Sequence, residues 1–349
     1  MREDSKDFND GSPMKPRAIN RHLNAVYPAL VLLAGMELDL FSYLSEGPKG
    51  VDQLAEEMSL KTSKLRPLLY ALVSAGLLEV KDEIFMNTEE AQEFLVKGKP
   101  RYFGDSYSTY QDLWKSTLFT AQSIRQAIPL AKHDFSNMTT EELHGFIIGL
   151  DSGAAATARR LHKNYDFSRY KNVLDAGGGS GGLVVELSKL CPDTRFSLLE
   201  LPAVAAIAQK RIAKGQLDDK ISIIKADLTK DLLGEKSFDA IVLRSVIQVL
   251  GLEQSGVALE KLARCLLKGG DFFVIGRVLE DNRLEPAEAV SANVMFLNVY
   301  ESGGSFTVSE YQRIFSCCGF VMKERLSLTG GYTLMRFSRT RNYEEITHL

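Results

Sequence analysis

A run of glycines between two apolar segments constrains this chain more than any other feature of its sequence. Residues 173–182 have the sequence VLDAGGGSGG. The apolar residues that begin this run predict a short strand, and residues 183–190 predict a helix, so the glycines fall at a strand-to-helix turn. Glycine is needed where the backbone takes positive φ or where a ligand approaches it closely. The free N–H groups at the start of the next helix would offer that ligand hydrogen bonds and a partial positive charge.

Two nucleotide-binding motifs fit the same residues. Gly177, Gly179 and Gly182 match the spacing of the dinucleotide-binding fingerprint. Asp175, followed by Gly177, Gly179 and Gly181, matches the loop of class I S-adenosylmethionine (SAM) methyltransferases. The Asp175 carboxylate decides between them, because it suits a ligand with an ammonium and a sulfonium better than it suits a pyrophosphate. The sequence therefore favours SAM, and a glycine turn without a ligand remains the alternative.

The length and charge of the chain limit its class. With 349 residues, 45% of them hydrophobic and 25% charged, it has the composition of a soluble globular protein of about two domains. A net charge of −3 gives no electrostatic reason to expect nucleic acid or an anionic membrane as a partner. The most apolar run, residues 26–36, is too short to span a bilayer.

The cysteines lack the paired spacing of a metal site, so no metal is predicted. There are four: Cys191, Cys265, Cys317 and Cys318. The adjacent Cys317 and Cys318 fall at what looks like a buried helix end, where reduced thiols are expected. Reduced thiols and the lack of a signal peptide predict a cytoplasmic protein.

The N-terminal part predicts a polar leader and then a long apolar helix. Residues 1–17 are mostly polar and are expected to be disordered. Residues 19–44 predict a helix that is broken or kinked near Pro28. Its apolar residues lie on almost every side, so we expect it to be buried on more than one side, in a dimer interface.

A winged-helix pattern completes this domain, which spans residues 18–100. Two short helices are predicted at residues 51–58 and 63–75, and a small hairpin follows at 76–87. A winged helix can bind DNA, but the helix at 63–75 has few basic residues at its exposed start. We therefore favour a structural or dimerisation role over DNA binding.

The remainder predicts an α/β domain that a helical segment covers. Residues 101–165 are helical and rich in aromatics, and Tyr110, Trp114 and His144 are candidates to roof a pocket. From residue 166 to 340, strands and helices alternate, which predicts a mostly parallel sheet with a closing antiparallel hairpin. Candidate strands are residues 172–175, 195–200, 221–225, 238–243, 271–275, 321–326 and 333–337. This is the class I methyltransferase variant of the Rossmann-like doubly wound sheet, and residues 341–349 form a tail.

Polar side chains follow three of the predicted strands, where ligands bind in such sheets. Glu200 ends the second strand and is placed to accept both ribose hydroxyls; a solvated strand-end carboxylate is the alternative. Asp227 ends the third strand and suits the adenine amino group, although Asp also caps helices. Arg244 follows the fourth strand and suits stacking on adenine or pairing with Asp227.

From about residue 20 to 338 the chain resembles the dimeric winged-helix SAM-dependent methyltransferases, which include plant phenolic and bacterial antibiotic O-methyltransferases. The matching segments are residues 77–78, 164–168, 175–181, 199–202, 268–270 and 303–304 with Thr307. The resemblance implies a small-molecule acceptor and a homodimer in which the N-terminal helices close the partner's pocket. It also implies that SAM is held by Asp175, Gly177, Gly178, Gly179, Gly181, Glu200, Leu201, Asp227, Leu228 and Arg244.

The family pattern breaks at the catalytic position. O-methyltransferases of this family carry a His-Asp-Trp motif after the fourth strand, with His as the general base. The matching residues 245–251 have the sequence SVIQVLG, and Gln248 stands where the base should be. An amide cannot take a proton near neutrality. The glutamate that orients the His would fall at Gly276, and the turn at 303–306 lacks the further acid.

The missing base favours an acceptor that carries no proton. A phenol has a pKa of about 10 and needs help to attack a methyl group, whereas a thioether sulfur needs only to be held in line. The pattern resembles the branch that S-methylates 4-methylthio-2-hydroxybutyrate on the route to dimethylsulfoniopropionate. That substrate is a carboxylate, so we expect a pocket arginine, for which Arg277 is the candidate. Further pocket candidates, besides Gln248 itself, are Trp114, His144, Asn298 and Tyr300.

Three alternatives remain open. The acceptor is a carbon atom, as in bacteriochlorophyllide C-methyltransferases, which also lack the His. It is a hydroxyl, with His144 or a tyrosine as the base. Or the chain is a catalytically inactive SAM-binding regulator, against which the complete set of cofactor residues argues.

Overall fold

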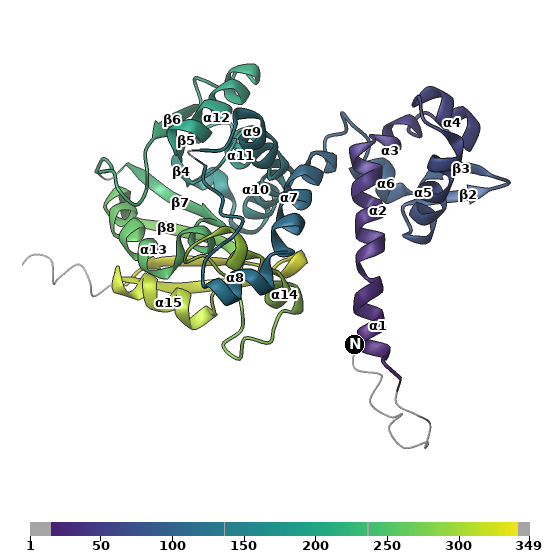
Figure 1. Cartoon of the computed structure of the whole chain (residues 1–349). Coiled ribbons are helices and arrows are strands. Elements are labelled where there is room, and N and C mark those ends of the chain that lie inside the picture. Colours follow the sequence, from purple (N-terminus) through teal and green to yellow (C-terminus); the bar gives the residue numbers. More distant parts are fainter. Residues whose placement is uncertain (1–14, 136, 236, 341–349) are drawn as a thin grey trace, which may run out of the picture. The chain divides into compact units, whose positions relative to one another are not determined.

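The computed structural model describes residues 15–340, apart from residues 136 and 236. The predicted tail (341–349) and most of the predicted leader (1–14) lie outside the described residues. The chain divides between Gly104 and Asp105 into two compact units, and each is described by itself (Figure 1).

The smaller unit consists of short helices and a three-stranded sheet. Its helices are α1 (Arg17–Asn24), α2 (Val26–Glu37), α3 (Leu40–Tyr43), α4 (Val51–Glu57), α5 (Thr62–Ser74) and α6 (Glu89–Phe94). The predicted hairpin is present as β2 (Leu78–Lys81) and β3 (Ile84–Asn87). A third strand, β1 (Lys49–Gly50), was not predicted and pairs with β3 on its other side.

The predicted long apolar helix is three helices, and its first break lies near the proline, as predicted. α1 and α2 separate at Ala25, three residues before Pro28. Proline lacks the N–H that would bond the carbonyl four residues earlier, which is that of Asn24, the last residue of α1. α2 ends before Asp39, which has a φ of 53° in the left-handed region.

The expected burial of this segment on more than one side is not met within the single chain. Ile19, Leu23 and Tyr27 are 63%, 68% and 62% exposed. Leu33 and Met36, further along α2, are buried. An apolar face of α1 and of the first half of α2 is therefore left uncovered by the described residues of the smaller unit.

The larger unit carries the predicted alternation of strands and helices. Its first four helices are α7 (Tyr107–Thr117), α8 (Thr120–Gln126), α9 (Thr140–Gly149) and α10 (Asp151–Tyr165). The helices that follow are α11 (Gly182–Leu190), α12 (Pro202–Lys214), α13 (Val246–Cys265), α14 (Ala287–Val299) and α15 (Val308–Cys317). Its strands are β4 (Asn172–Ala176), β5 (Arg195–Glu200), β6 (Ile221–Lys225), β7 (Phe238–Arg244), β8 (Leu266–Arg277), β9 (Phe320–Ser327) and β10 (Tyr332–Arg339).

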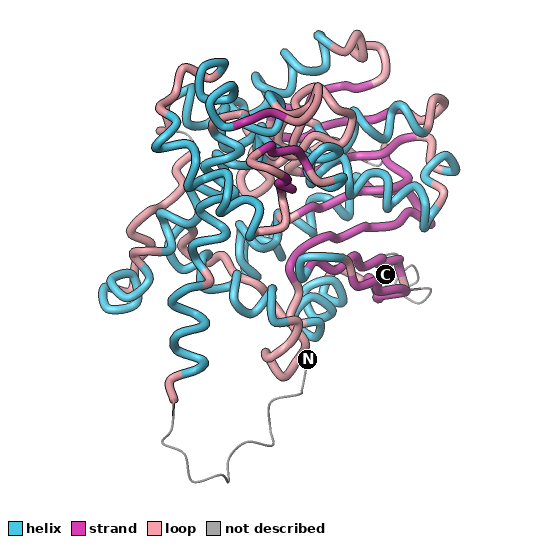
Figure 2. The backbone as a smooth tube through the Cα atoms, turned by 90° about the vertical axis from the view of Figure 1, so that its right-hand side faces the viewer, coloured by secondary structure: helices cyan, strands magenta, loops and turns pink. Residues whose placement is uncertain are grey.

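The seven strands form one sheet in the order β6-β5-β4-β7-β8-β10-β9. The strands from β6 to β8 in this order are parallel, and β10 is antiparallel to both of its neighbours. All seven predicted strands are present, and Figure 2 shows them in magenta among the cyan helices. The order reverses between β4 and β7, and ligands of doubly wound sheets bind at such a point.

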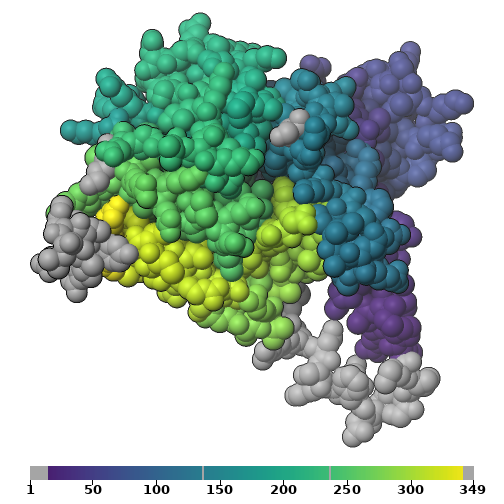
Figure 3. Space-filling view, turned by 60° about the vertical axis from the view of Figure 1, so that its left-hand side comes forward, coloured from purple at the N-terminus to yellow at the C-terminus, as the bar shows by residue number. Residues whose placement is uncertain are grey.

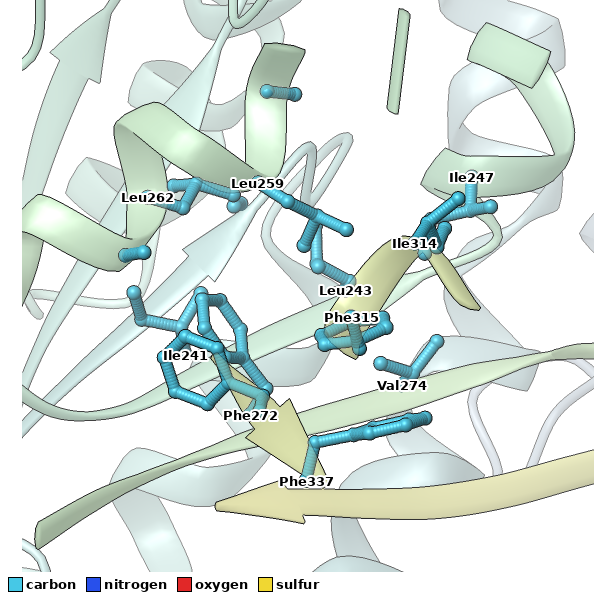
Figure 4. Close-up of a cluster of buried hydrophobic side chains, with 14 of the residues drawn as sticks. Ile241, Leu243, Ile247, Leu259, Leu262, Phe272, Val274, Ile314, Phe315 and Phe337 are labelled. Carbon is cyan, nitrogen blue, oxygen red and sulfur yellow. The ribbon is translucent and has the colours of Figure 1, made fainter. Parts of the chain in front are cut away.

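Helices cover both faces of this sheet because successive strand residues point to opposite sides. On one face Ile241, Phe272 and Val274 pack against α13 and α15 (Figure 4). Phe315 of α15 stacks on Phe337 of β10 with ring centroids 3.9 Å apart. The alternate residues pack against α10, α11 and α12 on the other face. Full burial of each large apolar side chain stabilises the fold by about 1.5–3 kcal/mol.

The prediction of a buried cysteine pair is wrong. Cys317 is exposed and Cys318 is only partly buried. The buried face of α15 passes through Tyr311 and Phe315, and the helical period places residue 317 on the opposite side.

Figure 3 shows the surface of this part of the chain, with the last described residues in yellow beside green segments. Among the described helices, none is both long and apolar enough to cross a membrane.

Candidate active site

The glycine-rich segment forms the turn between β4 and α11. Gly177, Gly179 and Gly181 have φ values of 74°, 62° and 81°, in the left-handed region that favours glycine. A Cβ on Gly178 would lie 2.3 Å from Oδ2 of Asp175. The turn therefore excludes side chains at residues 177–179 and at Gly181, which leaves its backbone open to a ligand.

Asp175 lies at the end of β4 and is fully buried. Neither of its carboxyl oxygens has a hydrogen-bond partner among the described residues. Burial raises the pKa of Asp175 to about 7; the positive charge of Arg244 opposes this shift, and the negative charge of Glu200 adds to it. A buried carboxylate without a partner is unfavourable. This site therefore favours a ligand that brings a cation or hydrogen-bond donors.

Glu200 ends β5 and reaches back to the glycine turn. Its Oε1 accepts a hydrogen bond from the Gly179 N–H (3.0 Å), and its Oε2 accepts one from the Leu201 N–H (2.7 Å). Burial raises its pKa to about 7, although both backbone hydrogen bonds act to lower it. A buried and a partly buried carboxyl thus lie next to one backbone turn, and these acceptors fit the ammonium, sulfonium and ribose hydroxyls of SAM.

Asp227 follows β6, and its carboxylate bonds to residues of its own turn. Its Oδ1 accepts hydrogen bonds from the N–H and Oγ of Thr229, and its Oδ2 pairs with Lys230 at 3.1 Å. Burial acts to raise the pKa of Asp227, but the bonds from Thr229 and Lys230 outweigh it, so the pKa is lowered. Leu228 beside it is buried in the core on the α13 side of the sheet. A role of Asp227 and Leu228 toward adenine stays a prediction.

Arg244 ends β7 and lies against α10. Its Nε donates to Oγ1 of Thr157 at 3.3 Å, and a Cβ on Gly153 would lie 2.6 Å from its Nη2. The suggested pair with Asp227 is not formed, since Asp227 pairs with Lys230 instead. The guanidinium instead lies close enough to Asp175 for its charge to oppose the rise in the pKa of that carboxyl. Contacts with α10 thus hold the Arg244 side chain near Asp175.

Gln248, expected from the sequence at the position of a catalytic His, is held by the backbone of a neighbouring strand. Its Oε1 accepts from the N–H of Arg277 (3.0 Å), and its Nε2 donates to the carbonyl of Arg277 (3.2 Å). The side chain is only 1% exposed. This pairing satisfies both ends of the amide and both backbone groups of the last residue of β8. Gln248 is a structural link between α13 and β8, with no capacity to accept a proton.

Gly276 makes room for that link. A Cβ at this position would lie 2.7 Å from Oε1 of Gln248. The space beside β8, where the family's orienting glutamate would begin, is therefore filled by the amide of Gln248. The two expected departures from the family pattern, at Gln248 and at Gly276, therefore lie in contact with each other.

Arg277, the last residue of β8, contacts β10 and the turn before it. Its Nη1 donates to the carbonyl of Gly330 (2.9 Å), and its guanidinium lies 4.9 Å from the ring centre of Tyr332. Burial raises the pKa of Tyr110, and the nearby charges of Arg277 and Arg244 oppose that shift. The phenol of Tyr110 in α7 therefore lies near both arginines. Arg244 and Arg277, the two arginines predicted for the site, both lie at the carboxyl ends of their strands, β7 and β8.

Trp114 and Asn298 differ in what surrounds them. The ring of Trp114 lies 5.8 Å from that of Tyr110, one turn earlier in α7, so Trp114 belongs to the same surface. Asn298 is fully buried, and its amide bonds to the hydroxyls of Ser123 and Thr120 in α8. Asn298 ties α14 to α8, which leaves its amide no part in a pocket.

His144 is not among the strand-end residues. It is exposed on α9 and lines a groove between α9 and α12. None of the residues that end β4, β5, β7 or β8 lines that groove. The suggestion that His144 is a base for the acceptor therefore finds no support in the fold.

A second histidine, which sequence reasoning missed, is buried beside Tyr300. His133 lies in the loop between α8 and α9; its Nε2 is 2.7 Å from Oδ2 of Asp112 in α7, and its Nδ1 is 3.4 Å from the Tyr300 hydroxyl. Its ring contacts Phe146 edge-on at 4.7 Å. Burial, and then the charge of Asp112, raise the pKa of Tyr300. No motif marks His133 in the sequence, because its partners come from distant helices.

Models of known families match most of the chain. The O-methyltransferase domain matches residues 121–321, and the O-methyltransferase dimerisation domain matches residues 20–97. The first spans β4 to β8 with their strand-end residues and most of the helices around them, but not α7 or β10. The second covers the smaller unit.

Individual relatives span nearly the whole chain. The tetracenomycin polyketide synthesis 8-O-methyl transferase TcmO of Streptomyces glaucescens is 25% identical over 317 residues, 89% of this chain and 93% of that protein. The N,N-dimethyltransferase OxyT of Streptomyces rimosus is 24% identical over 330 residues, 90% of this chain and 94% of its own.

A solved structure shows the same fold. The human N-acetylserotonin methyltransferase in complex with SAM superposes with a TM-score of 0.79 at 21% identity, covering 95% of this chain and 99% of that one. The carboxyls of Asp175 and Glu200 at the glycine turn fit the same cofactor. The chain therefore belongs to the O-methyltransferase family, as a SAM-dependent methyltransferase that carries the family's dimerisation domain.

Proposed function

We propose that this enzyme transfers the methyl group of SAM to the thioether sulfur of a small carboxylate such as 4-methylthio-2-hydroxybutyrate. The observation that carries the proposal is the state of Gln248, whose amide is bound at both ends to the backbone of Arg277. The position that holds a proton acceptor in the family holds a structural amide here. A thioether sulfur has no proton to lose, so its methylation needs no base at this position.

The residues proposed to hold SAM lie around the glycine turn. Asp175 and Glu200 supply one buried and one partly buried carboxyl for the cationic and hydroxyl groups, and the glycines leave the backbone open. Arg244 and Asp227 complete the set at the ends of β7 and β6. Bound there, SAM would supply an electrophilic methyl group on a cationic sulfur.

Arg277 is proposed to bind the carboxylate of the acceptor. Its guanidinium lies at the end of β8 beside Tyr332. It is also close enough to Tyr110 for its charge to act on the pKa of that phenol. An Arg–carboxylate pair that is partly shielded from water contributes roughly 1.5–3 kcal/mol. The phenol of Tyr110 and the indole of Trp114 offer aromatic faces to a sulfonium product.

Replacing Arg277 with leucine should raise the KM for 4-methylthio-2-hydroxybutyrate by about 10- to 100-fold, with a smaller change in kcat. The reason is loss of the carboxylate's partner without loss of any group at the sulfur. Formation of S-adenosylhomocysteine measures both parameters. The KM for the methyl ester of the same acceptor should change little in the variant, because the ester has no carboxylate to bind. An equal rise in KM for acid and ester would show that Arg277 does not bind the carboxylate.

A panel of acceptors tests the reaction itself. Thioether carboxylates should support formation of S-adenosylhomocysteine, whereas phenols and porphyrin-type carbon acceptors should not. Turnover of the porphyrin-type acceptor alone would replace the proposal with C-methylation. Tight SAM binding without turnover on any class would favour an inactive regulator, although membership of an enzyme family argues against this outcome.

A second candidate is O-methylation with His133 as the base. The His133–Asp112 pair, at 2.7 Å, is the kind of oriented imidazole that general-base catalysis uses, and TcmO is described as an O-methyl transferase. In that case a His133→Asn variant should lose about 100-fold or more in kcat on a phenol. Under the thioether proposal the same variant should keep kcat within a few-fold, because no proton leaves the acceptor.

A homodimer is proposed for the assembly. The matched dimerisation domain and the uncovered apolar face of α1 and α2 support it. Burying Ile19, Leu23 and Tyr27 against a second copy would remove their apolar surface from water.

A further inference from the structure

A groove of about 500 Å³ lies between α9 and α12, apart from the strand ends. Leu143 and Ile148 of α9 and Ile207 of α12 give it an apolar wall. Ala206 adds only a methyl group, which keeps the space open. A volume of this size accommodates a small organic molecule.

One end of the groove is basic. Lys210, Arg211 and Lys214 follow one another on the same face of α12, and His144 faces them from α9. Among the residues that the structure describes, no Asp or Glu lines the groove, although the whole chain has a net charge of −3. Lys210 and Lys214 are exposed and form no ion pair with any other residue that the structure describes. Such a groove, with an apolar wall and a cationic end, complements a ligand that has an apolar body and an anionic end.

Arg211 connects this basic end to the cofactor turn. Its guanidinium pairs with Asp151 at the start of α10 and lies 3.5 Å from Oγ of Ser180, within the glycine turn. Ser180 in turn donates a hydrogen bond to Asp151. A Cβ on Gly182 would lie 2.8 Å from Oδ1 of Asp151, so this carboxylate is packed closely on the first turn of α11. A second anion at Arg211 would compete with Asp151.

We propose that this groove binds an anionic amphiphile, a small molecule with an apolar body and a carboxylate or similar anion, and that Arg211 couples its occupancy to the cofactor turn. The site is distinct from the proposed acceptor site, since none of the strand-end residues lines it. It does not depend on which atom accepts the methyl group. Its ligand lowers SAM affinity by drawing Arg211 away from Asp151, and SAM lowers the affinity for the ligand by the same factor.

Octanoate is a suitable probe, with 1-octanol and octylamine as neutral and cationic partners of equal chain length. Calorimetric titration of the full-length protein should show octanoate binding at least about tenfold more tightly than 1-octanol, with octylamine weakest. Each exposed ion pair contributes up to about 1 kcal/mol, so losing two should cost about tenfold in affinity. The variant Lys210→Gln/Lys214→Gln should show this loss, whereas Lys163→Gln, an exposed lysine on α10, should bind octanoate like the wild type.

Filling the groove gives an independent check. Ala206→Trp should abolish octanoate binding while circular dichroism and SAM binding show that the protein is folded. Saturating octanoate should raise the Kd for SAM about threefold or more in the wild type but not in Ala206→Trp. Equal affinity for octanoate and 1-octanol, or wild-type binding by the double lysine variant, would overturn the site. Unchanged SAM affinity with octanoate bound would overturn the coupling through Arg211.

Discussion

Lowering the pH from 7.5 to 5.5 is expected to weaken SAM binding by roughly 25-fold or more. Burial raises the pKa of both Asp175 and Glu200 to about 7, and a cationic cofactor binds to ionised carboxylates. At pH 5.5 at least one of these carboxyls must give up a proton on binding, which costs roughly 2 kcal/mol for a difference of 1.5 pH units. Isothermal titration calorimetry at the two pH values measures the change.

In the protein without cofactor, raising the pH should have the opposite effect: ionisation of Asp175 and Glu200 should lower the stability of the fold. Their folded-state pKa values lie above their ordinary values of 3.8 and 4.5, so the folded state binds protons more tightly than the unfolded state. Their contribution to stability is therefore fully present below about pH 4 and is lost as the pH rises through about 7. The melting temperature of this form should fall from pH 5.5 to 7.5, and the stabilisation by SAM should rise.

Asp175→Asn should flatten the pH dependence of SAM binding, and Asp219→Asn, an exposed aspartate between α12 and β6, should not. A SAM affinity that stays constant between pH 5.5 and 7.5 would show that neither carboxyl changes its protonation on binding. In that case the two acids would not form the anionic site described for the cationic cofactor.

Replacing Gln248 with leucine should destabilise the protein by about 2–4 kcal/mol and change kcat less than tenfold. Leucine fills much of the same volume but leaves the N–H and carbonyl of Arg277 buried without their partners. An unsatisfied buried backbone group costs about 1–3 kcal/mol. Urea unfolding gives the free energy of unfolding, and formation of S-adenosylhomocysteine under saturating thioether gives kcat.

Gln254→Leu is the matched control, because Gln254 lies exposed on the same helix. Its unfolding free energy should stay within about 0.5 kcal/mol of the wild type. A stable Gln248→Leu protein with a thousandfold loss of kcat would mean that the amide takes part in the chemistry rather than in the link between α13 and β8.

The sequence predicted the fold because its signals are local or follow from parallel strands. The alternation of apolar runs identified all seven strands of the sheet, and the requirement for positive φ identified the glycine turn. Parallel strands end at one edge of a sheet, so Asp175, Glu200 and Arg244 could be placed together before any coordinates. The absence of a base at Gln248 was also visible in the sequence.

Contacts between distant segments could not be predicted. The amide of Gln248 meets the backbone of Arg277 only through the packing of α13 on β8. His133 carries no motif, and only the folding of the loop after α8 brings it to Asp112. Cys317 was expected in the core because a helix end has no periodic signal of its own, and it lies on the outer side of α15.

The count of protons released during turnover tests the central claim most directly. In weakly buffered solution near neutral pH, full-length enzyme with SAM and 4-methylthio-2-hydroxybutyrate should form one S-adenosylhomocysteine per sulfonium product and release no proton in the transfer. The His133→Asn variant should behave in the same way. Turnover confined to a hydroxyl acceptor, with one proton released per methyl transferred and with dependence on His133, would contradict the account.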